Sequence, residues 1–162
     1  MNISADKRIT LTVVLVALLL VTVMSCSSGN ARIRPTWIVT ETSGDNVAIS
    51  NQEVEKAGMA HFRINSGGQE YVYMAYKFGN ETVVRSSICP PCRSRSFSIQ
   101  GDTLICDSCQ TTFNARTGDG IAGPCVDYPK AQVAFTRNSD RLVMKASDLL
   151  SAYQNTLKPG LP

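Results

Sequence analysis

Residues 89–125 read CPPCRSRSFSIQGDTLICDSCQTTFNARTGDGIAGPC and hold five of the six cysteines in the chain. Two C-x-x-C pairs are separated by thirteen residues, and a fifth thiol follows sixteen residues after the second pair. Two-residue spacing lets both thiolates of a pair point at one ion from a single tight turn. Two such turns, brought together by a hairpin, surround one centre with four sulfur atoms. The stretch therefore predicts a metal or iron–sulfur site with four ligands: Cys89, Cys92, Cys106 and Cys109.

Three kinds of site fit the cysteine spacing taken alone. Two C-x-x-C turns at this separation satisfy a zinc ribbon, an exported chain favours disulfides, and iron–sulfur clusters are also held by cysteines. Five downstream cysteines leave one thiol over from a complete disulfide framework and exceed the four that zinc requires. Spacing alone favours zinc. The enzyme activity that stays open is thiol–disulfide exchange by a C-x-x-C pair, because the sequence contains no hydrolytic or phosphate-binding motif.

The size and charge of the chain limit the remaining possibilities. At 162 residues it is long enough for one domain and little more. Its formal net charge is +3, and the basic residues are scattered along the sequence, which is too weak a bias to predict nucleic-acid binding. We therefore expect one folded domain and no nucleic-acid partner.

The N-terminus has the pattern of an export signal that ends in a lipidation site. A charged start leads into an apolar run from Ile9 to Met24, and a branched residue and a serine precede Cys26 in the order that lipoprotein processing requires. The alternative is an uncleaved membrane anchor, but the run is about sixteen residues and a spanning helix needs ~20. We predict an exported protein held to a membrane by acyl chains on Cys26, facing the periplasm or the cell exterior. The predicted segments are a lipoprotein signal peptide over residues 1–25, a lipidated N-terminus and tether over 26–36, and a metal-binding domain over 37–162.

Branched and aromatic residues predict a mostly β domain of antiparallel strands. The longest strand is expected over residues 70–78, with alternate side chains on opposite faces: Tyr71, Tyr73 and Ala75 on one, and Val72, Met74 and Tyr76 on the other. Further strands are expected over 37–40, 47–49, 59–65, 82–85, 97–99, 103–105, 132–137 and 141–145.

Two helical segments are predicted. Ser50 and Glu53 have the spacing of a capping box, and Gly58 ends one or two turns. Near the C-terminus, Ser147 is predicted to cap a short amphipathic helix with four apolar residues near one face: Leu149, Leu150, Tyr153 and Leu157.

The residues around the second cysteine pair resemble the second cluster-binding loop of Rieske proteins. From Cys106 the chain reads CDSCQTTFNARTG, in which Phe113 and Thr117-Gly118 stand at the offsets of an aromatic residue and a Thr-Gly turn in that loop. Gly123-Pro124 resembles the proline loop that shields a Rieske cluster. Rieske proteins have a histidine where this chain has the second cysteine of each pair. The resemblance therefore implies an all-cysteine centre, with a potential towards roughly −400 mV and no pH dependence from titrating histidines.

A second resemblance covers most of the exported domain. The order of strand, C-x-x-C, short hairpin, C-x-x-C, aromatic residue and lone cysteine is similar to the FtrD-like membrane iron–sulfur protein family. That family often has a glycine after each pair, where this chain has Arg93 and Gln110. The resemblance implies an iron–sulfur cluster or related metal site, electron transfer, a link to iron uptake, and a membrane redox or iron-transport protein as partner. It also implies a small antiparallel Rieske-like or zinc-ribbon-like domain, to which the sequence pattern adds a short C-terminal helix.

Residues close to the cysteine pairs have more than one interpretation. Cys125 follows Gly123-Pro124 and is expected near the cluster, as a further ligand, an exchangeable ligand, a redox partner of one pair or a buried thiol. Three arginines adjoin the first pair and either offset the negative charge of the thiolates or are ordinary solvated side chains: Arg85, Arg93 and Arg95. His61 is the only histidine, and we expect it to be a packed or exposed residue without a role as a ligand.

Overall fold

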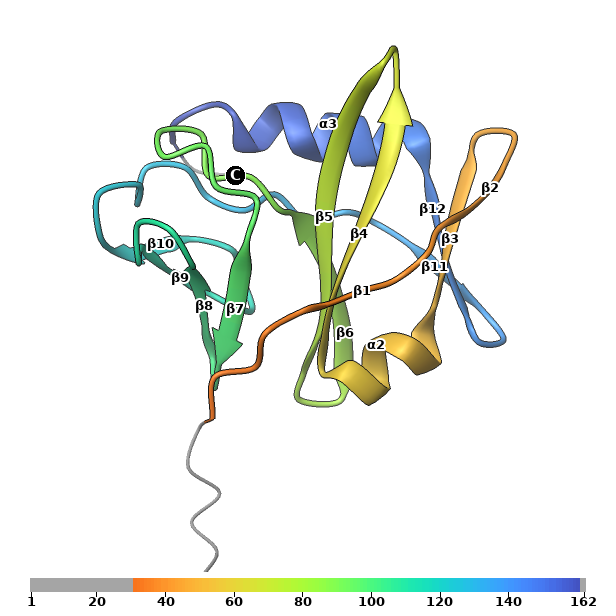
Figure 1. The fold of residues 1–162 in the computed structure, drawn as a ribbon, viewed down its shortest axis with the longest axis horizontal. Helices are drawn as coiled ribbons and strands as arrows, with labels where there is room; N and C mark the ends of the chain where they lie inside the picture. The colour runs from red at the N-terminus through yellow and green to blue at the C-terminus, as the bar shows by residue number, and fades with distance from the viewer. Residues whose placement is uncertain (1–30, 161–162) are drawn as a thin grey trace, which may run out of the picture. The chain divides into compact units, whose positions relative to one another are not determined.

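The computed structural model describes residues 31–160 (Figure 1). Over these residues the chain forms twelve strands and two helices, and the strands make three four-stranded sheets. Every neighbouring pair of strands is antiparallel except β1 with β4, which are parallel. The prediction of a small, mostly β, antiparallel domain with a short C-terminal helix is confirmed.

The first sheet, in the order β1-β4-β5-β6, is the centre of the domain. Its strands are β1 (Thr36–Trp37), β4 (Met59–Ser66), β5 (Gln69–Phe78) and β6 (Glu81–Ser86). The second sheet, in the order β10-β9-β8-β7, carries the cysteines. Its strands are β7 (Phe97–Gln100), β8 (Thr103–Cys106), β9 (Thr112–Asn114) and β10 (Gly120–Ala122). The third sheet, in the order β11-β12-β3-β2, contains β2 (Glu41–Ser43), β3 (Asn46–Ser50), β11 (Thr136–Asn138) and β12 (Arg141–Lys145).

Strand β5 separates two hydrophobic cores, because both of its faces are buried. Tyr73 and Ala75 belong to the larger core, which includes residues of the third sheet and of the C-terminal helix. Met74 and Tyr76 belong to the smaller core, which includes the cysteines and the aromatic residues of the second sheet. The predicted alternation of side chains along this strand is thus observed, and in Figure 1 the central sheet stands between the other two. The cysteine site is built on one of the two cores.

The two helices agree with the sequence to different degrees. Helix α2 (Asn51–Ala57) has Ser50 as its N-cap, and the Ser50 side chain accepts a hydrogen bond from the backbone N–H of Glu53, as predicted. Helix α3 (Ala146–Thr156) begins one residue before Ser147, so the predicted cap is wrong. Strand β12 leads directly into α3, which places Lys145 at the N-cap without a side-chain hydrogen bond. In residues 31–160 neither helix has the length and apolar character needed to cross a membrane.

Two further segments differ in extent from the predicted elements. The strand expected over 132–137 is shorter, since β11 begins at Thr136, and Leu157 lies beyond the end of α3.

The residues before β1 also contact the folded domain. Ile33 exchanges two backbone hydrogen bonds with Ile99, and Arg32 forms an ion pair with Asp107. The folded domain therefore includes contacts from residues before β1. The predicted signal peptide and Cys26 lie outside the described residues.

Candidate metal centre

The two C-x-x-C loops have the same backbone arrangement. The backbone N–H of Cys89 donates to the carbonyl of Ser94 at 2.8 Å, and the backbone N–H of Cys106 donates to the carbonyl of Thr111 at 2.9 Å. Each hydrogen bond spans five residues and closes the loop over its cysteine pair. The residue that follows each pair, Arg93 or Gln110, has a φ of 58°. This left-handed conformation favours glycine, so each loop ends in a strained backbone position.

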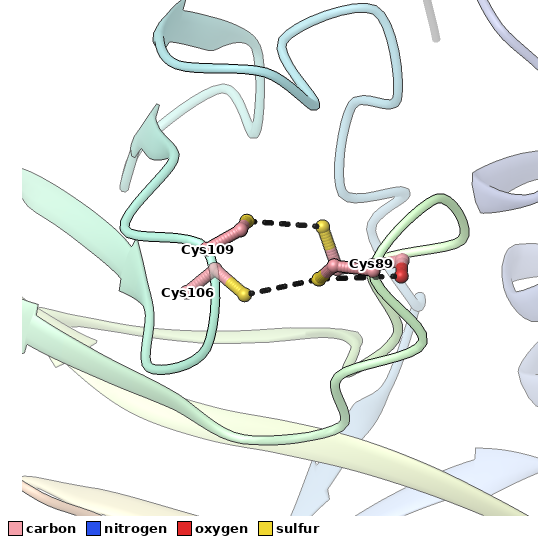
Figure 2. Close-up of side chains that lie close together, drawn as sticks. Cys89, Cys106 and Cys109 are labelled. Atoms are coloured by element: carbon pink, nitrogen blue, oxygen red, sulfur yellow. Dashed lines mark hydrogen bonds between the residues drawn. The ribbon is translucent and has the colours of Figure 1, made fainter.

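The two loops bring the four predicted ligands together. Cys89 and Cys92 follow β6, whereas Cys106 ends β8 and Cys109 lies in the turn before β9. The four Sγ atoms all lie within 4.8 Å of one another. The Cys89 and Cys109 sulfur atoms are 3.9 Å apart, and those of Cys92 and Cys106 are 3.7 Å apart. Figure 2 shows Cys106 and Cys109 directing their sulfur atoms at the opposite loop.

Burial divides the four cysteines into an inner and an outer pair. Cys89 and Cys106 are completely buried, while Cys92 and Cys109 are half-buried. The first cysteine of each loop thus packs into the smaller core, and the second faces outward. A group bound by all four thiols would be shielded from water on one side and accessible on the other.

Cys125 lies beside Cys109. Its Sγ is 3.7 Å from the Sγ of Cys109, and its backbone N–H donates to the Thr111 Oγ1 at 3.1 Å. The same Thr111 oxygen is 3.1 Å from the Cys109 sulfur. A Cβ on Gly123 would stand 2.7 Å from the Thr111 Cα, so only glycine allows this close approach. Cys125 therefore lies next to one of the four candidate ligands, and its role as a ligand stays a prediction.

The buried thiols do not titrate independently of one another. A hydrogen bond with Cys106, together with burial, raises the pKa of Cys89, and the same hydrogen bond lowers the pKa of Cys106 to about 4. The two thiols therefore titrate as a coupled pair. For Cys109, hydrogen bonds from the Thr111 side chain and backbone outweigh burial and lower the pKa. Burial raises the pKa of Cys92 to about 11, so the pKa is lowered at Cys106 and Cys109 and raised at Cys89 and Cys92.

A buried lysine provides positive charge next to the cysteines. The Lys130 side chain is completely buried, and its Nζ donates to the carbonyl of Ile88 at 2.9 Å. The same nitrogen lies 4.4 Å from the ring centre of Phe113 and 5.5 Å from that of Phe97. Sequence reasoning missed Lys130, since its partner Ile88 is 42 residues away along the chain and no motif marks this lysine.

The three arginines near the first pair occupy different environments. Arg85 is 1% exposed, and its guanidinium donates to the Tyr76 hydroxyl at 2.9 Å and to the backbone carbonyls of Lys130 and Arg116. Arg85 is thus neither a solvated side chain nor a partner of the thiolates, because it holds the backbone around the site. Arg93 and Arg95 are exposed, and Arg95 pairs with Glu70 at 3.4 Å.

His61 is a packed core residue, as expected. It is 2% exposed, its ring lies edge-on to Trp37 at 5.4 Å, and its Nε2 is 3.4 Å from the Ser87 Oγ. Burial lowers the pKa of His61 to about 4, against a smaller opposing effect of the Asp107 carboxylate. Within residues 31–160, the group of side chains that could hold a metal ion consists of four cysteines and does not include His61.

The residues present suit a cysteine-ligated metal or iron–sulfur centre. Four thiols from two loops converge, and the buried Lys130 ammonium contacts the carbonyl of Ile88, the residue before Cys89. Soft thiolate ligands select zinc and iron–sulfur clusters over hard cations such as magnesium. The fold and this cluster define the chain as a small, mostly β domain of the cysteine-based metal-binding class.

Comparison with known families identifies the chain further. The family described as "Membrane iron-sulfur containing protein FtrD-like" matches residues 54–155, and the chain belongs to this family. The matched region contains all five cysteines of the candidate site. The resemblance seen in the sequence is confirmed.

Two solved structures show similarity to the chain. A complex of reduced oxygenase and oxidized ferredoxin in carbazole 1,9a-dioxygenase is similar over 60% of this chain and 88% of the other, with 16% identity and a TM-score of 0.49. A ferredoxin of Sphingomonas yanoikuyae B1 is similar over 71% of this chain and 98% of its own, with 16% identity and a TM-score of 0.43. Among curated proteins no sequence matches the chain.

Proposed function

We propose that this protein is a membrane-anchored, extracytoplasmic lipoprotein whose domain holds an iron–sulfur cluster and transfers electrons. The observation that carries the proposal is the convergence of four cysteine sulfurs within 4.8 Å of one another in a chain of the FtrD-like family. Cys26 is the proposed lipidation site. The proposed cluster ligands are Cys89, Cys92, Cys106 and Cys109, with Cys125 adjacent.

The arrangement of the ligands suits an electron carrier. When bound, an iron–sulfur cluster accepts and releases an electron. The inner thiols of Cys89 and Cys106 are shielded by the smaller core, which excludes water from that side. The outer thiols of Cys92 and Cys109 reach the surface, so this edge is where a partner protein approaches. We propose a membrane redox or iron-transport protein as that partner, since the family resemblance implies a link to iron uptake.

Air-free purification of the full chain tests the proposal. We expect visible absorption from sulfur-to-iron charge transfer, with iron and acid-labile sulfide both present in the protein. Colourless protein with one zinc ion would contradict an electron-transfer role, and metal-free protein with disulfides would favour thiol–disulfide exchange instead. A measured midpoint potential above zero would contradict an all-cysteine cluster.

One specific observation favours zinc as the second candidate. A tetrahedral ion with metal–sulfur bonds of about 2.3 Å places its sulfurs about 3.8 Å apart, and two of the sulfur–sulfur distances between the loops are 3.7 and 3.9 Å. A structural zinc ion would then join the two loops without redox chemistry. The metal analysis above separates this module from an iron–sulfur carrier.

A further inference from the structure

Lys130 is held in a fixed position from several directions. Its backbone N–H donates to the Gly118 carbonyl at 2.9 Å, and its own carbonyl accepts a hydrogen bond from Arg85 at 2.6 Å. At the far end of the side chain, Nζ donates to the Ile88 carbonyl, one residue before Cys89. A Cβ on Gly118 would collide with the Lys130 carbonyl, so a glycine is required where the chain packs against this lysine. Lys130 is therefore fixed at both its backbone and its side chain by contacts with three other residues of the site.

The burial of this side chain needs an energetic reason. Removing an ammonium group from water is unfavourable unless charge or hydrogen bonds compensate. One carbonyl and two aromatic rings, from Phe97 and Phe113, surround the nitrogen, and cation–π contacts with desolvated rings contribute only about 2 kcal/mol. No carboxylate pairs with Lys130 in residues 31–160. Ile88 precedes Cys89, and both rings belong to the smaller core that contains Cys89, Cys106 and Cys125, so we attribute the compensating negative charge to these thiols.

The electrostatics of Lys130 agree with this assignment. Burial lowers the pKa of Lys130 to about 8, while the neighbouring thiols oppose that effect, in the order Cys89, Cys106, Cys125 and Cys92. The side chain thus carries its charge at neutral pH. Among the basic residues near the site, Arg85 is committed to its own carbonyl and hydroxyl partners, whereas Arg93 and Arg95 are exposed and screened by water and salt.

We propose that Lys130 is a positioning residue of the metal centre, whose fixed buried charge strengthens metal binding by the four thiolates and raises the reduction potential of the iron-loaded protein. The part of this inference that concerns the potential rests on the proposed function. A centre with four thiolates is net negative, and reduction adds one more negative charge. A cation in the low-dielectric interior stabilises the reduced form more than the oxidised form. The same charge favours the tetrathiolate arrangement around any divalent ion.

The experiment compares four full-length proteins. Lys130→Met removes the charge and keeps the length and apolar stem of the side chain. Lys130→Gln also removes the charge but keeps a donor for the Ile88 carbonyl, which separates charge from hydrogen bonding and provides a second variant if the first does not fold. Lys56→Met is the matched control, because Lys56 is exposed on α2. Each is compared with the unsubstituted protein.

Two quantities are measured on each protein. The first is the midpoint potential after loading with iron and sulfide. We expect the midpoint potential of both Lys130 variants to be at least 59 mV lower, which is a tenfold shift of the one-electron equilibrium towards the oxidised form. The potential of Lys56→Met should match that of the unsubstituted protein. The second is the affinity for Co²⁺, followed by thiolate-to-cobalt charge-transfer absorption. We expect an affinity at least tenfold weaker in both Lys130 variants.

The outcomes separate the inference from the proposed function. Weaker Co²⁺ binding in the Lys130 variants, with no iron–sulfur cluster in any protein, would support the role of the charge and contradict the proposed electron carrier. A cluster with the same potential and the same Co²⁺ affinity in Lys130→Gln and the unsubstituted protein would overturn the inference and leave the proposed function intact.

Discussion

At the scale of single residues, each of the two cysteine loops contains one residue with a strained backbone conformation. Arg93 and Gln110 both have a φ of 58° at the position after a cysteine pair. The left-handed conformation costs a non-glycine residue roughly 1–2 kcal/mol. Gln110 recovers part of this cost, because its side-chain amide donates to the carbonyl of Asp107 at 2.9 Å. Arg93 is exposed and forms no side-chain hydrogen bond with the described residues.

We predict that Arg93→Gly increases the free energy of unfolding by about 1 kcal/mol, since glycine adopts this conformation without strain. Denaturant unfolding measures the change. Arg95→Gly is the control, because Arg95 is also an exposed arginine but its φ is not positive. It should destabilise the protein slightly. A loss of stability in both variants would show that the strain is absent.

The buried His61 makes stability depend on pH. The folded pKa near 4 lies below the ordinary 6.5, so between these values the unfolded chain binds the proton more readily and stability rises with pH. We predict that lowering the pH from 6.5 to 4 costs about 3 kcal/mol through this residue. The variant His61→Gln should lose that part of the pH dependence. Unfolding curves of both proteins across this range measure it, and parallel pH profiles would be inconsistent with a buried neutral imidazole.

At the scale of elements, strand β6 is connected to the site by a buried guanidinium. Arg85 contacts the Tyr76 hydroxyl on β5, and that hydroxyl donates to the Ala115 carbonyl at 2.6 Å. Arg85 also reaches the carbonyls of Arg116 and Lys130. One side chain thus satisfies polar groups from three segments that are distant in sequence.

We predict that Arg85→Met destabilises the protein by at least about 3 kcal/mol, because several buried acceptors lose their donor. Arg141→Met is the control, since Arg141 forms a surface ion pair with Glu41 at 2.6 Å and such pairs contribute about 1 kcal/mol or less. Thermal and denaturant unfolding give both values. Equal effects of the two substitutions would mean that the Arg85 contacts do not stabilise the fold.

The elements show which features are predictable from sequence. The alternation on β5, the Ser50 cap and the hairpin over 97–106 depend on neighbouring residues, and the structure confirms them. The predicted cap of α3 is wrong because the helix continues directly from β12. Its start is also held by a contact between remote segments, in which the backbone N–H of Ala146 donates to the Asp45 carbonyl. Lys130 was missed for the same reason. Spacing locates the ligands, but it does not reveal the buried charges around them.

At the scale of the whole molecule, the proposal depends on an anchor at Cys26. We predict that the detergent-extracted protein begins at Cys26 and carries acyl chains, because the segment before it matches the lipoprotein-processing pattern. Mass spectrometry of the intact protein shows both features. The variant Cys26→Ser should lose the added acyl mass. An intact N-terminus at Met1 without acyl mass would contradict the lipid anchor.

The central claim is that Cys89, Cys92, Cys106 and Cys109 hold an iron–sulfur cluster. X-ray absorption at the iron edge of the air-free purified protein tests it most directly, because it counts the atoms around the metal. We predict only sulfur neighbours at about 2.3 Å, together with a second iron atom, and loss of this signal in the Cys106→Ser variant. Nitrogen or oxygen neighbours, a signal unchanged in Cys106→Ser, or zinc in place of iron would contradict the account.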